Sequence, residues 1–339
     1  MIYTLIVMKY IKTGWDIPYY NFALEEYMLE CDKFNGGCFF FYIHRPSIII
    51  GSHQNAFSEI NSDYVKEKGI IVARRLTGGG AVYHDGGNLN FSYIFDRGEN
   101  DFIDFARYTQ PVMAALKSFG VECSLSGRND ITARGRKFSG NAEMRTKNKL
   151  LHHGTLMFDV DVREMVSSLD PDNMKFIDKA VDSVKSRVIN IKDLICGEGT
   201  IEDLKDAIIS ETCSRWDVEE YELTAQDLAV IEDKVKNRFS TYEHNFGSSP
   251  KFSCERKNKY PAGLIRLGFE VQNGLIADIL ISGDFFLNGE LEDVYEALKG
   301  VRYEKDDVQK ALSMMNSGRG FDNIINNFTA EEFLGLMFS

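Results

Sequence analysis

Apolar residues recur at helical spacing in several parts of the chain. The clearest case is the segment 16–30, where Pro18 fits the first turn of a helix. Its apolar positions are Tyr19, Tyr20, Ala23, Leu24, Tyr27 and Met28. Residues at this spacing share one face of a helix. Further helices are expected over 111–119, 202–216, 224–239, 290–299, 305–315 and 330–337.

Short apolar or alternating runs predict strands. Leu89, Phe91, Tyr93 and Phe95 alternate with other residues, which predicts a half-buried strand over 88–95. Further strands are expected over 1–10, 39–44, 47–50, 70–73, 138–144, 151–158, 264–272 and 275–282. Asn273-Gly274 separates the last two strands, and Asn-Gly between alternating strands is a strong hairpin signal.

A turn-rich stretch divides the chain into two expected domains. Residues 240–250 include Asn245, Gly247, Ser248, Ser249 and Pro250, a composition suited to a linker. We expect a first domain over 1–245, a linker over 246–254 and a small α+β domain over 255–339. The hydrophobic content of 44% is sufficient for a substantial core.

The net charge and the positions of the cysteines limit the classes of function and the compartment expected for this chain. A formal net charge of −12 argues against general nucleic-acid binding, which needs a basic face. The six cysteines are scattered and form no Cys-x-x-Cys pair, which indicates free thiols in a reducing compartment. Segment 1–10 is interpreted as a strand rather than a signal peptide, and no run of 18 apolar residues predicts a membrane span. We expect a cytoplasmic monomer.

Three consecutive glycines follow two arginines in the segment 74–85, Arg-Arg-Leu-Thr-Gly-Gly-Gly-Ala-Val-Tyr-His-Asp. Such glycines expose backbone N–H groups and allow positive φ, so the loop can wrap an anion. The arginines add forked donors for phosphate or carboxylate. The alternative is a flexible hairpin turn leading into a strand at Val82 and Tyr83. Neither a dinucleotide G-x-G-x-x-G before a helix nor a G-x-x-x-x-G-K-[ST] phosphate loop occurs.

A second group of polar residues lies between 127 and 156. Lys137 opens a predicted strand among small or polar neighbours, so its amine can point into a cleft; the alternative is a solvated surface lysine. Asn129-Asp130 can cap a turn or hold a cation beside a phosphate. His152 and His153 face opposite ways on a strand, which argues against both binding one metal ion and favours structural histidines.

Taken together, these motifs make the sequence resemble the lipoate–protein ligase A family. The resemblance is carried by collinear segments at 22–26, Gly51 with Gln54-Asn55, 74–85, 127–130, 137–142, 153–156 and 184–190, the last containing Ser-Arg-Val-Ile-Asn. It extends to Gly283-Asp284-Phe285-Phe286, which resembles Gram-positive members. It implies an α/β catalytic domain of the biotin/lipoate protein ligase type, with a mixed sheet like that of class II synthetases, and a small α+β accessory domain.

The resemblance also implies an adenylate-forming ligase. Lipoate and MgATP would give lipoyl-AMP and pyrophosphate, and a lysine of a lipoyl domain would then take the acyl group. By resemblance, Lys137 is the catalytic residue that touches the lipoyl carbonyl and the phosphate. The implied nucleotide-binding residues are Arg75, Gly78, Gly79, Gly80, Ala81, Val82, Tyr83, His84, Asp130 and Lys137, with Asp130 the candidate position for Mg²⁺. The implied acceptors are glycine cleavage H protein and the acyltransferase subunits of 2-oxo acid dehydrogenases.

One departure from the family pattern and several competing functions accompany this interpretation. Ser52 stands where the family often has arginine, so either His53 replaces that contact or the contact is dispensable. An octanoyl- or lipoyltransferase acting through a thioester needs a nucleophilic cysteine at the cleft, and none lies between 127 and 153. A lipoyl relay without ATP and a weakly active lipoate-binding protein also compete with the ligase hypothesis. A biotin ligase is disfavoured because its G-R-G-R-x-G loop is absent.

Overall fold

The computed structural model describes residues 7–97, 105–127, 129–169, 177–195, 197–246, 254–272, 274–315 and 320–338. The chain forms two compact units. The first consists of Met1–Ile49, Ile60–Leu76 and Val82–Asn245, and the second of Ile50–Glu59, Thr77–Ala81 and Phe246–Ser339. Two short segments from the first third of the chain therefore belong to the second unit. Most of the expected linker lies outside the described residues, so the linker boundaries stay a prediction.

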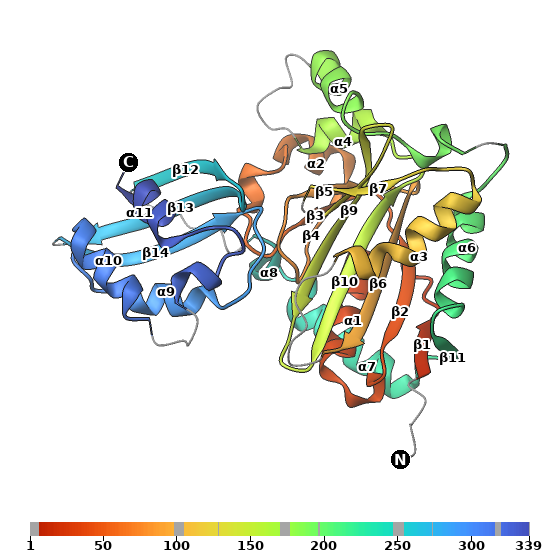
Figure 1. Ribbon diagram of the computed structural model, residues 1–339, viewed down its shortest axis with the longest axis horizontal. Coiled ribbons are helices and arrows are strands. Elements are labelled where there is room, and N and C mark those ends of the chain that lie inside the picture. The colour runs from red at the N-terminus through yellow and green to blue at the C-terminus, as the bar shows by residue number, and fades with distance from the viewer. Residues whose placement is uncertain are drawn as a thin grey trace. The chain divides into compact units, whose positions relative to one another are not determined.

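The first unit is built on a mixed sheet of eight strands (Figure 1). Their order across the sheet is β11-β1-β2-β6-β10-β9-β8-β7. Strand β1 runs parallel to both of its neighbours, and the remaining pairs are antiparallel. The strands are β1 (Val7–Ile11), β2 (Cys38–Ile43), β6 (Asn88–Asp96), β7 (Ser124–Ser126), β8 (Asp130–Ala133), β9 (Arg136–Arg145), β10 (Lys149–Met157) and β11 (Asp217–Tyr221).

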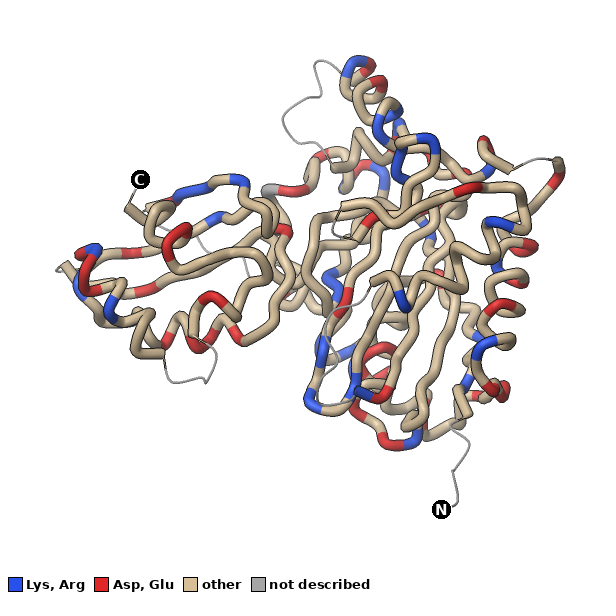
Figure 2. The backbone as a smooth tube through the Cα atoms, viewed as in Figure 1, with Lys and Arg blue, Asp and Glu red and all other residues tan. Residues whose placement is uncertain are grey.

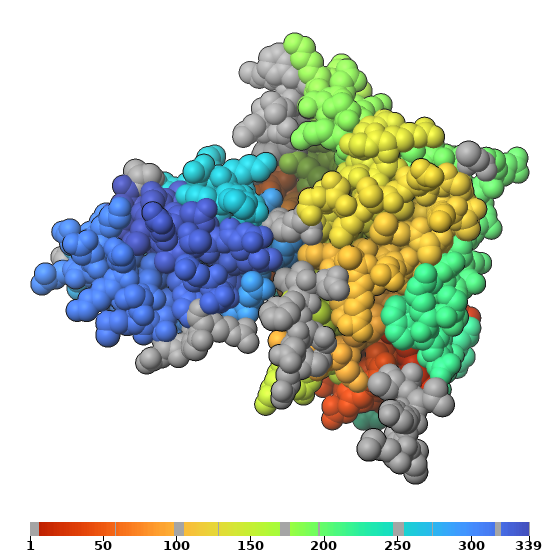
Figure 3. All heavy atoms as spheres, viewed as in Figure 1, coloured from red at the N-terminus to blue at the C-terminus, as the bar shows by residue number. Residues whose placement is uncertain are grey.

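Helices cover both faces of this sheet. Helices α3 (Phe105–Ser118) and α6 (Ile201–Cys213) pack together on the face turned to the viewer in Figure 3. Helices α1 (Pro18–Glu30) and α7 (Ala225–Lys234) pack on the other face, where α1 contacts β6 and β10. The central strands between them carry few charged residues (Figure 2). The expected mixed-sheet α/β fold is confirmed.

Strand β6 corrects one expectation. The alternation along it predicts one buried face, but Asn88, Asn90 and Ser92 are as buried as the apolar residues between them. The polar face is covered by α1 and neighbouring strands, where Ser92 Oγ donates to Glu25 and Asn90 donates to the Tyr42 carbonyl. The polar residues of this strand are thus interior hydrogen-bonding groups rather than solvated ones.

A smaller sheet in the order β4-β3-β5 adjoins the triple-glycine segment in sequence. Its strands are β3 (Ser47–Ile50), β4 (Ile71–Arg74) and β5 (Val82–His84). The shorter helices are α2 (Ser62–Lys68), α4 (Val162–Leu169), α5 (Ile177–Lys185) and α8 (Tyr242–Phe246), none of which the apolar spacing singled out. Helix α3 also begins earlier than expected, because Pro111 lies inside it rather than at its start.

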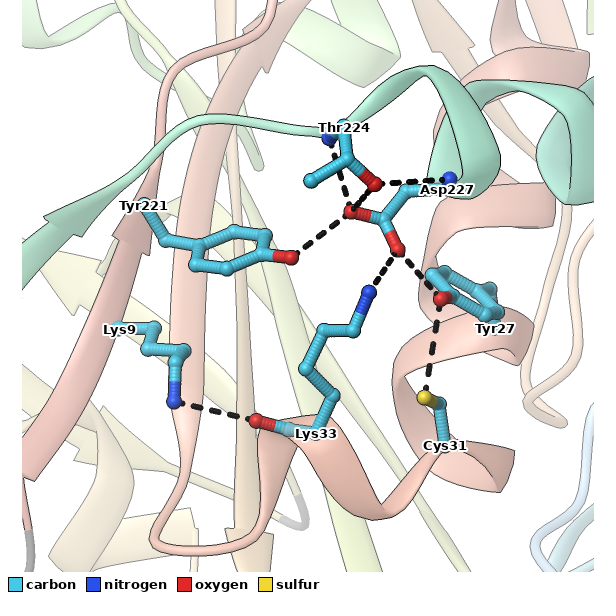
Figure 4. Close-up of polar contacts among 7 residues, drawn as sticks. All are labelled: Lys9, Tyr27, Cys31, Lys33, Tyr221, Thr224 and Asp227. Carbon is cyan, nitrogen blue, oxygen red and sulfur yellow. Dashed lines mark hydrogen bonds and ion pairs between the residues drawn. The ribbon is translucent and has the colours of Figure 1, made fainter.

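A buried carboxylate ties helix α7 to the rest of the first unit (Figure 4). Asp227 accepts hydrogen bonds from Thr224, whose backbone N–H and hydroxyl form a capping box with it. It also accepts from Tyr27 of α1 at 2.6 Å, from Tyr221 of β11 at 2.8 Å and from Lys33 at 2.5 Å. A helix cap and a contact between distant elements are combined in one side chain.

The second unit has its own antiparallel sheet in the order β12-β13-β14. The strands are β12 (Cys254–Tyr260), β13 (Gly263–Gln272) and β14 (Leu275–Gly283), and the hairpin expected between the last two is confirmed. Helices α9 (Leu291–Leu298), α10 (Lys305–Ser313) and α11 (Ala330–Met337) complete a core that includes Phe269, Phe285 and Phe333. No helix in the described parts of either unit is long and apolar enough to cross a membrane.

Candidate active site

Lys137 lies on β9 where this strand meets the Ser-Arg-Val-Ile-Asn segment. The Lys137 N–H donates to the Arg187 carbonyl at 2.8 Å, and the Ile189 N–H donates to the Lys137 carbonyl at 2.9 Å. Asn190 then fixes this segment through two side-chain bonds to the backbone of Val160, each 3.1 Å long. Two motifs that are about 50 residues apart in sequence thus meet as paired backbone.

The Lys137 side chain extends over a glycine toward a carboxylate. A Cβ placed on Gly140 would lie 3.1 Å from the Lys137 Nζ, so this glycine leaves the space that the lysine occupies. Nζ lies 2.7 Å from Asp130 Oδ1, with the two side chains 40% and 35% exposed. An ion pair this exposed contributes little stability. The ammonium can therefore exchange Asp130 for an anionic ligand at low energetic cost.

The Asn129-Asp130 turn has divided roles. Asn129 accepts the Asn141 N–H at 2.9 Å and the Asn141 amide at 3.0 Å through its carbonyl, so it holds β9 in place. Asp130 faces Lys137 instead. No group of three His, Cys, Asp or Glu side chains in the described ranges could hold a metal ion. A Mg²⁺ near Asp130 would take most ligands from nucleotide phosphates and water, which suits Mg²⁺.

The two adjacent histidines of β10 point to opposite faces, as strand geometry requires. His152 Nδ1 lies 2.9 Å from Glu143 Oε1, and His153 Nδ1 lies 2.9 Å from Glu25 Oε1. All four side chains are buried. Each histidine has a separate carboxylate partner, which matches the structural role expected for them.

His84 lies beside a second buried histidine. The Asn21 amide donates to His44 Nε2 at 3.2 Å, so we assign the His44 proton to Nδ1, which lies 3.0 Å from His84 Nδ1. Burial lowers the pKa of His44 to about 3. Burial, followed by His44 and the nearby Arg75, also lowers the pKa of His84 well below its ordinary value. Both rings are neutral at pH 7, and His84 presents a buried Nε2–H that lacks a partner among the described residues.

The two arginines before the glycines differ in role. The Arg74 guanidinium donates to the backbone carbonyls of His244 and Asn245 at 3.0 Å each, so it ties β4 to α8. Arg75 is buried and donates to the Ile49 carbonyl at 3.2 Å. Burial lowers the pKa of Arg75 to about 10, which still leaves it cationic at pH 7. Arg75 is therefore a fixed positive charge, whereas Arg74 is mainly structural.

The triple-glycine loop, Thr77–Ala81, belongs to the second unit. The alternative that it is a hairpin turn is wrong, because β3 lies between β4 and β5 in the sheet and the loop connects strands that are not neighbours. Gly79 has φ of +95°, a conformation that favours glycine. Of the expected site residues, Gly78, Gly79, Gly80 and Ala81 lie in the second unit, and Arg75, Val82, Tyr83, His84, Asp130 and Lys137 in the first.

Two buried polar residues were given no individual role by the sequence analysis. Glu25 is fully buried and accepts from His153 and Ser92, while its second oxygen has no protein partner in the described parts of the chain. Asn141 Oδ1 is likewise buried without a described partner. Glu25 directly follows the apolar run Phe22-Ala23-Leu24, and Glu25 and Asn141 both lie in segments, 22–26 and 137–142, that carry the family resemblance.

Comparison with known proteins gives matches over both units. The family pattern described as lipoyl protein ligase A/B catalytic domain matches residues 17–213. The pattern described as bacterial lipoate protein ligase C-terminus matches residues 249–337. Among curated relatives, lipoate-protein ligase LplJ of Bacillus subtilis is 42% identical, covering 95% of this chain and 97% of its own length. Lipoate–protein ligase 1 of Staphylococcus aureus is 40% identical, covering 87% and 90%.

Solved structures of similar proteins also match this chain. LipL1 of P. falciparum in complex with lipoate has a TM-score of 0.77 and 27% identity, covering 97% of each chain. A bipartite ligase of Thermoplasma acidophilum, reported with its E2 lipoyl domain, has a TM-score of 0.64 and 27% identity, covering 73% of this chain and 99% of that one. Lipoate-protein ligase A bound with ATP has a TM-score of 0.61 and 27% identity, covering 71% and 98%. The matches over both units show that the chain belongs to the lipoate–protein ligase family, a family of enzymes.

Proposed function

We propose that this chain is an ATP-dependent lipoate–protein ligase that works in two steps. In the first, a lipoate carboxylate oxygen bonds to the α-phosphorus of ATP, and the bond to the β-phosphate oxygen breaks to release pyrophosphate. In the second, the amine of an acceptor lysine attacks the lipoyl carbonyl, the bond to the AMP oxygen breaks, and the amine loses a proton. Relatives of this chain are solved with lipoate and with ATP, which supports both substrates.

The observation that carries the proposal is the Lys137 amine. It is partly exposed, lies over the bare Cα of Gly140 and is held by a partly exposed Asp130. Joining a carboxylate to a phosphate builds negative charge, and a preorganised cation stabilises that charge. We assign Lys137 to the lipoyl carbonyl and the phosphate, and Mg²⁺ near Asp130 to the leaving pyrophosphate.

The nucleotide side of the site is assigned to the remaining expected residues. Backbone N–H groups of Gly78, Gly80 and Ala81 would bind phosphate oxygens, since glycines allow close backbone approach. Gly79 would contribute the positive φ that shapes the loop, because its own N–H donates to the Phe285 carbonyl. Arg75 supplies a buried cation, and the neutral His84 supplies an N–H donor. Val82 and Tyr83 continue the loop as β5. The catalytic domain would span 1–245 and the accessory domain 255–339.

The proposed acceptor is the lipoyl domain of another protein. One relative is reported with its E2 lipoyl domain, which supports this class of partner. Glycine cleavage H protein and the acyltransferase subunits of 2-oxo acid dehydrogenases are the two kinds of acceptor we propose.

Two of the described cysteines are poorly suited to a thioester mechanism. Cys31, Cys38, Cys123, Cys213 and Cys254 are free thiols. Burial raises the pKa of Cys38 strongly and that of Cys123 to about 11, which keeps both protonated. A lipoyl relay without ATP is the second candidate function, since such an enzyme could keep much of this site.

The test supplies the full-length protein with lipoate, MgATP and an apo lipoyl domain. We expect pyrophosphate and AMP to be released and the acceptor lysine to gain the mass of a lipoyl group. Transfer that proceeds equally without ATP would favour the relay instead. Binding of lipoate without release of pyrophosphate would refute the ligase assignment.

A further inference from the structure

A turn of the second unit holds the triple-glycine loop through backbone contacts. The turn is Gly283-Asp284-Phe285-Phe286, which begins at the last residue of β14, and both segments belong to the same compact unit. The Gly79 N–H donates to the Phe285 carbonyl at 3.1 Å. One of the loop's own donors is therefore committed to the turn.

The approach is closest at Gly78. A Cβ added to Gly78 would lie 2.2 Å from the Phe285 carbonyl oxygen and 3.5 Å from the Phe286 Cα. Real Cβ atoms do not approach a backbone oxygen so closely, so loop and turn can pack in this way only if position 78 lacks a side chain. At Gly80 a Cβ would lie 3.7 Å from the Asp284 Cβ, which is ordinary van der Waals contact.

A third segment of the same unit completes the contact. The Gly283 N–H donates to the His53 carbonyl at 2.9 Å, and the His53 ring stacks on the Phe285 ring with centroids 5.2 Å apart and planes 4° apart. The Ser52 N–H donates to the Thr77 carbonyl at 2.9 Å. We call the turn 283–286 together with Ser52 and His53 the loop clamp.

The loop clamp is itself firmly anchored. Phe285 is fully buried in the core of the second unit. Asp284 accepts the Leu264 N–H through its side chain, which fixes the turn against β13. The loop, by contrast, has three glycines in succession, which have no side chains to restrict them. Glycine has the largest backbone entropy to lose, so an external support is needed to keep its N–H groups in one arrangement.

We propose that the loop clamp is the positioning element for adenylate formation, with Phe285 and His53 as its positioning residues. This rests on the proposed function, in which the loop binds ATP phosphates. The first step must align two separate anions, so it depends on a preorganised loop. The second step begins from an adenylate that is already assembled and depends on it less.

The main test compares glycine-to-alanine substitutions in the full-length protein. Gly78→Ala forces the loop away from Phe285, and we expect pyrophosphate release from lipoate and MgATP to fall about 10²-fold, as for a misplacement of about 1 Å. Transfer from chemically prepared lipoyl-AMP to an apo lipoyl domain should fall by less than about tenfold. Gly86→Ala, where nothing lies within 4 Å of an added Cβ, is the matched control and should retain wild-type rates.

A loss of activity in Gly78→Ala could arise because the clamp no longer supports the loop or because the new methyl group blocks the nucleotide. Gly80→Ala distinguishes these two explanations. It changes the same loop but meets Asp284 only at ordinary contact distance, so its loss of pyrophosphate release should be at least about tenfold smaller than that of Gly78→Ala. Equal losses of pyrophosphate release in the two variants would overturn the inference, because they would indicate that an added methyl group obstructs the nucleotide rather than the clamp. The inference would also be overturned if Gly78→Ala lowered pyrophosphate release and transfer from lipoyl-AMP by the same factor.

His53 provides a second test at the other side of the clamp. His53→Ala removes the ring from Phe285 and should lower pyrophosphate release, whereas His53→Phe keeps a stacked ring without nitrogen atoms and should restore it. Rescue by His53→Arg but not by His53→Phe would overturn the inference in favour of a charge contact with substrate. Circular dichroism melting curves check that each variant is folded. A wild-type protein that releases no pyrophosphate would refute the proposed function itself, which is a distinguishable result.

Discussion

At the scale of single residues, the candidate site depends on glycines, which leave space, as much as on residues with functional side chains. Gly140 leaves the volume in which the Lys137 amine lies. Gly154 leaves room for Asn141 and Phe91, since a Cβ there would lie 2.4 Å from an atom of each. Burial keeps His44 and His84 neutral and leaves Arg75 charged. These residues give the site fixed donors whose protonation does not change near neutral pH.

Lys137 is the residue whose replacement tests the site most directly. Lys137→Ala should lower pyrophosphate release by about 10²–10³-fold, because it removes one preorganised donor to developing charge. The fold should persist, since the lysine side chain is 40% exposed. Lys147→Ala, in the exposed turn between β9 and β10, is the control and should leave the rate unchanged. A Lys137→Ala enzyme with the wild-type rate would exclude Lys137 from catalysis.

At the scale of elements, polar side chains determine how helices and strands are joined. Two helices of the first unit start with the same Thr-x-x-Asp capping box, at Thr200-Asp203 and Thr224-Asp227. The first is exposed and caps α6, whereas Asp227 is buried and also binds Tyr27, Lys33 and Tyr221. The same local motif therefore has a long-range role only where other elements cover it.

Asp227 should make stability depend on pH in the acid range. Burial alone would raise its pKa, but hydrogen bonds from Lys33, Tyr27, Thr224 and Tyr221 outweigh burial and lower it. A pKa lowered by folding adds stability above the unfolded value near 4, and this stability is lost as pH falls toward the folded value. In urea unfolding, Asp227→Asn should be destabilised by about 1–3 kcal/mol at pH 7.

The stability gap between wild type and Asp227→Asn should shrink by about 1 kcal/mol between pH 5 and pH 3. Asp203→Asn is the matched control, and its smaller effect should follow from its exposed position. A gap that stays constant down to pH 3 would contradict the lowered pKa.

At the scale of the whole molecule, the two compact units do not follow the chain in a simple order. The second unit contains the C-terminal module together with the segments Ile50–Glu59 and Thr77–Ala81. The segments that resemble ligand-binding motifs are therefore divided between the units. The triple-glycine loop therefore belongs to the same compact unit as the C-terminal module.

Substrates should stabilise the folded protein if adenylate forms. Without an acceptor, lipoate with MgATP would accumulate bound lipoyl-AMP, and a ligand at 100 times its Kd adds about 2.7 kcal/mol. Melting temperatures should therefore rise more with both substrates than with either alone. The nonhydrolysable analogue of ATP with a methylene between the α- and β-phosphates is the control, because it cannot release pyrophosphate. An equal rise with the analogue would indicate binding without reaction.

The sequence alone determined the elements whose pattern is local. The helix at 16–30, the hairpin around Gly274 and the strands on either side of the glycine loop follow from apolar spacing and turn residues, and the structure contains them. The collinear motifs also predicted the family, which the comparisons confirm. The helix, hairpin and strands depend on neighbours within a few positions, so the local sequence carries the information that specifies them.

Only the tertiary structure decided which of these elements meet. It placed β3 between β4 and β5, buried the polar face of β6 under α1, and assigned the triple-glycine loop to the same unit as Phe285. It also paired Lys137 with Asp130 and buried His44 and His84, which keeps both rings neutral. Strand order, burial of polar groups and pKa values depend on residues tens or hundreds of positions apart, and the spacing of residues along one segment carries no information about them.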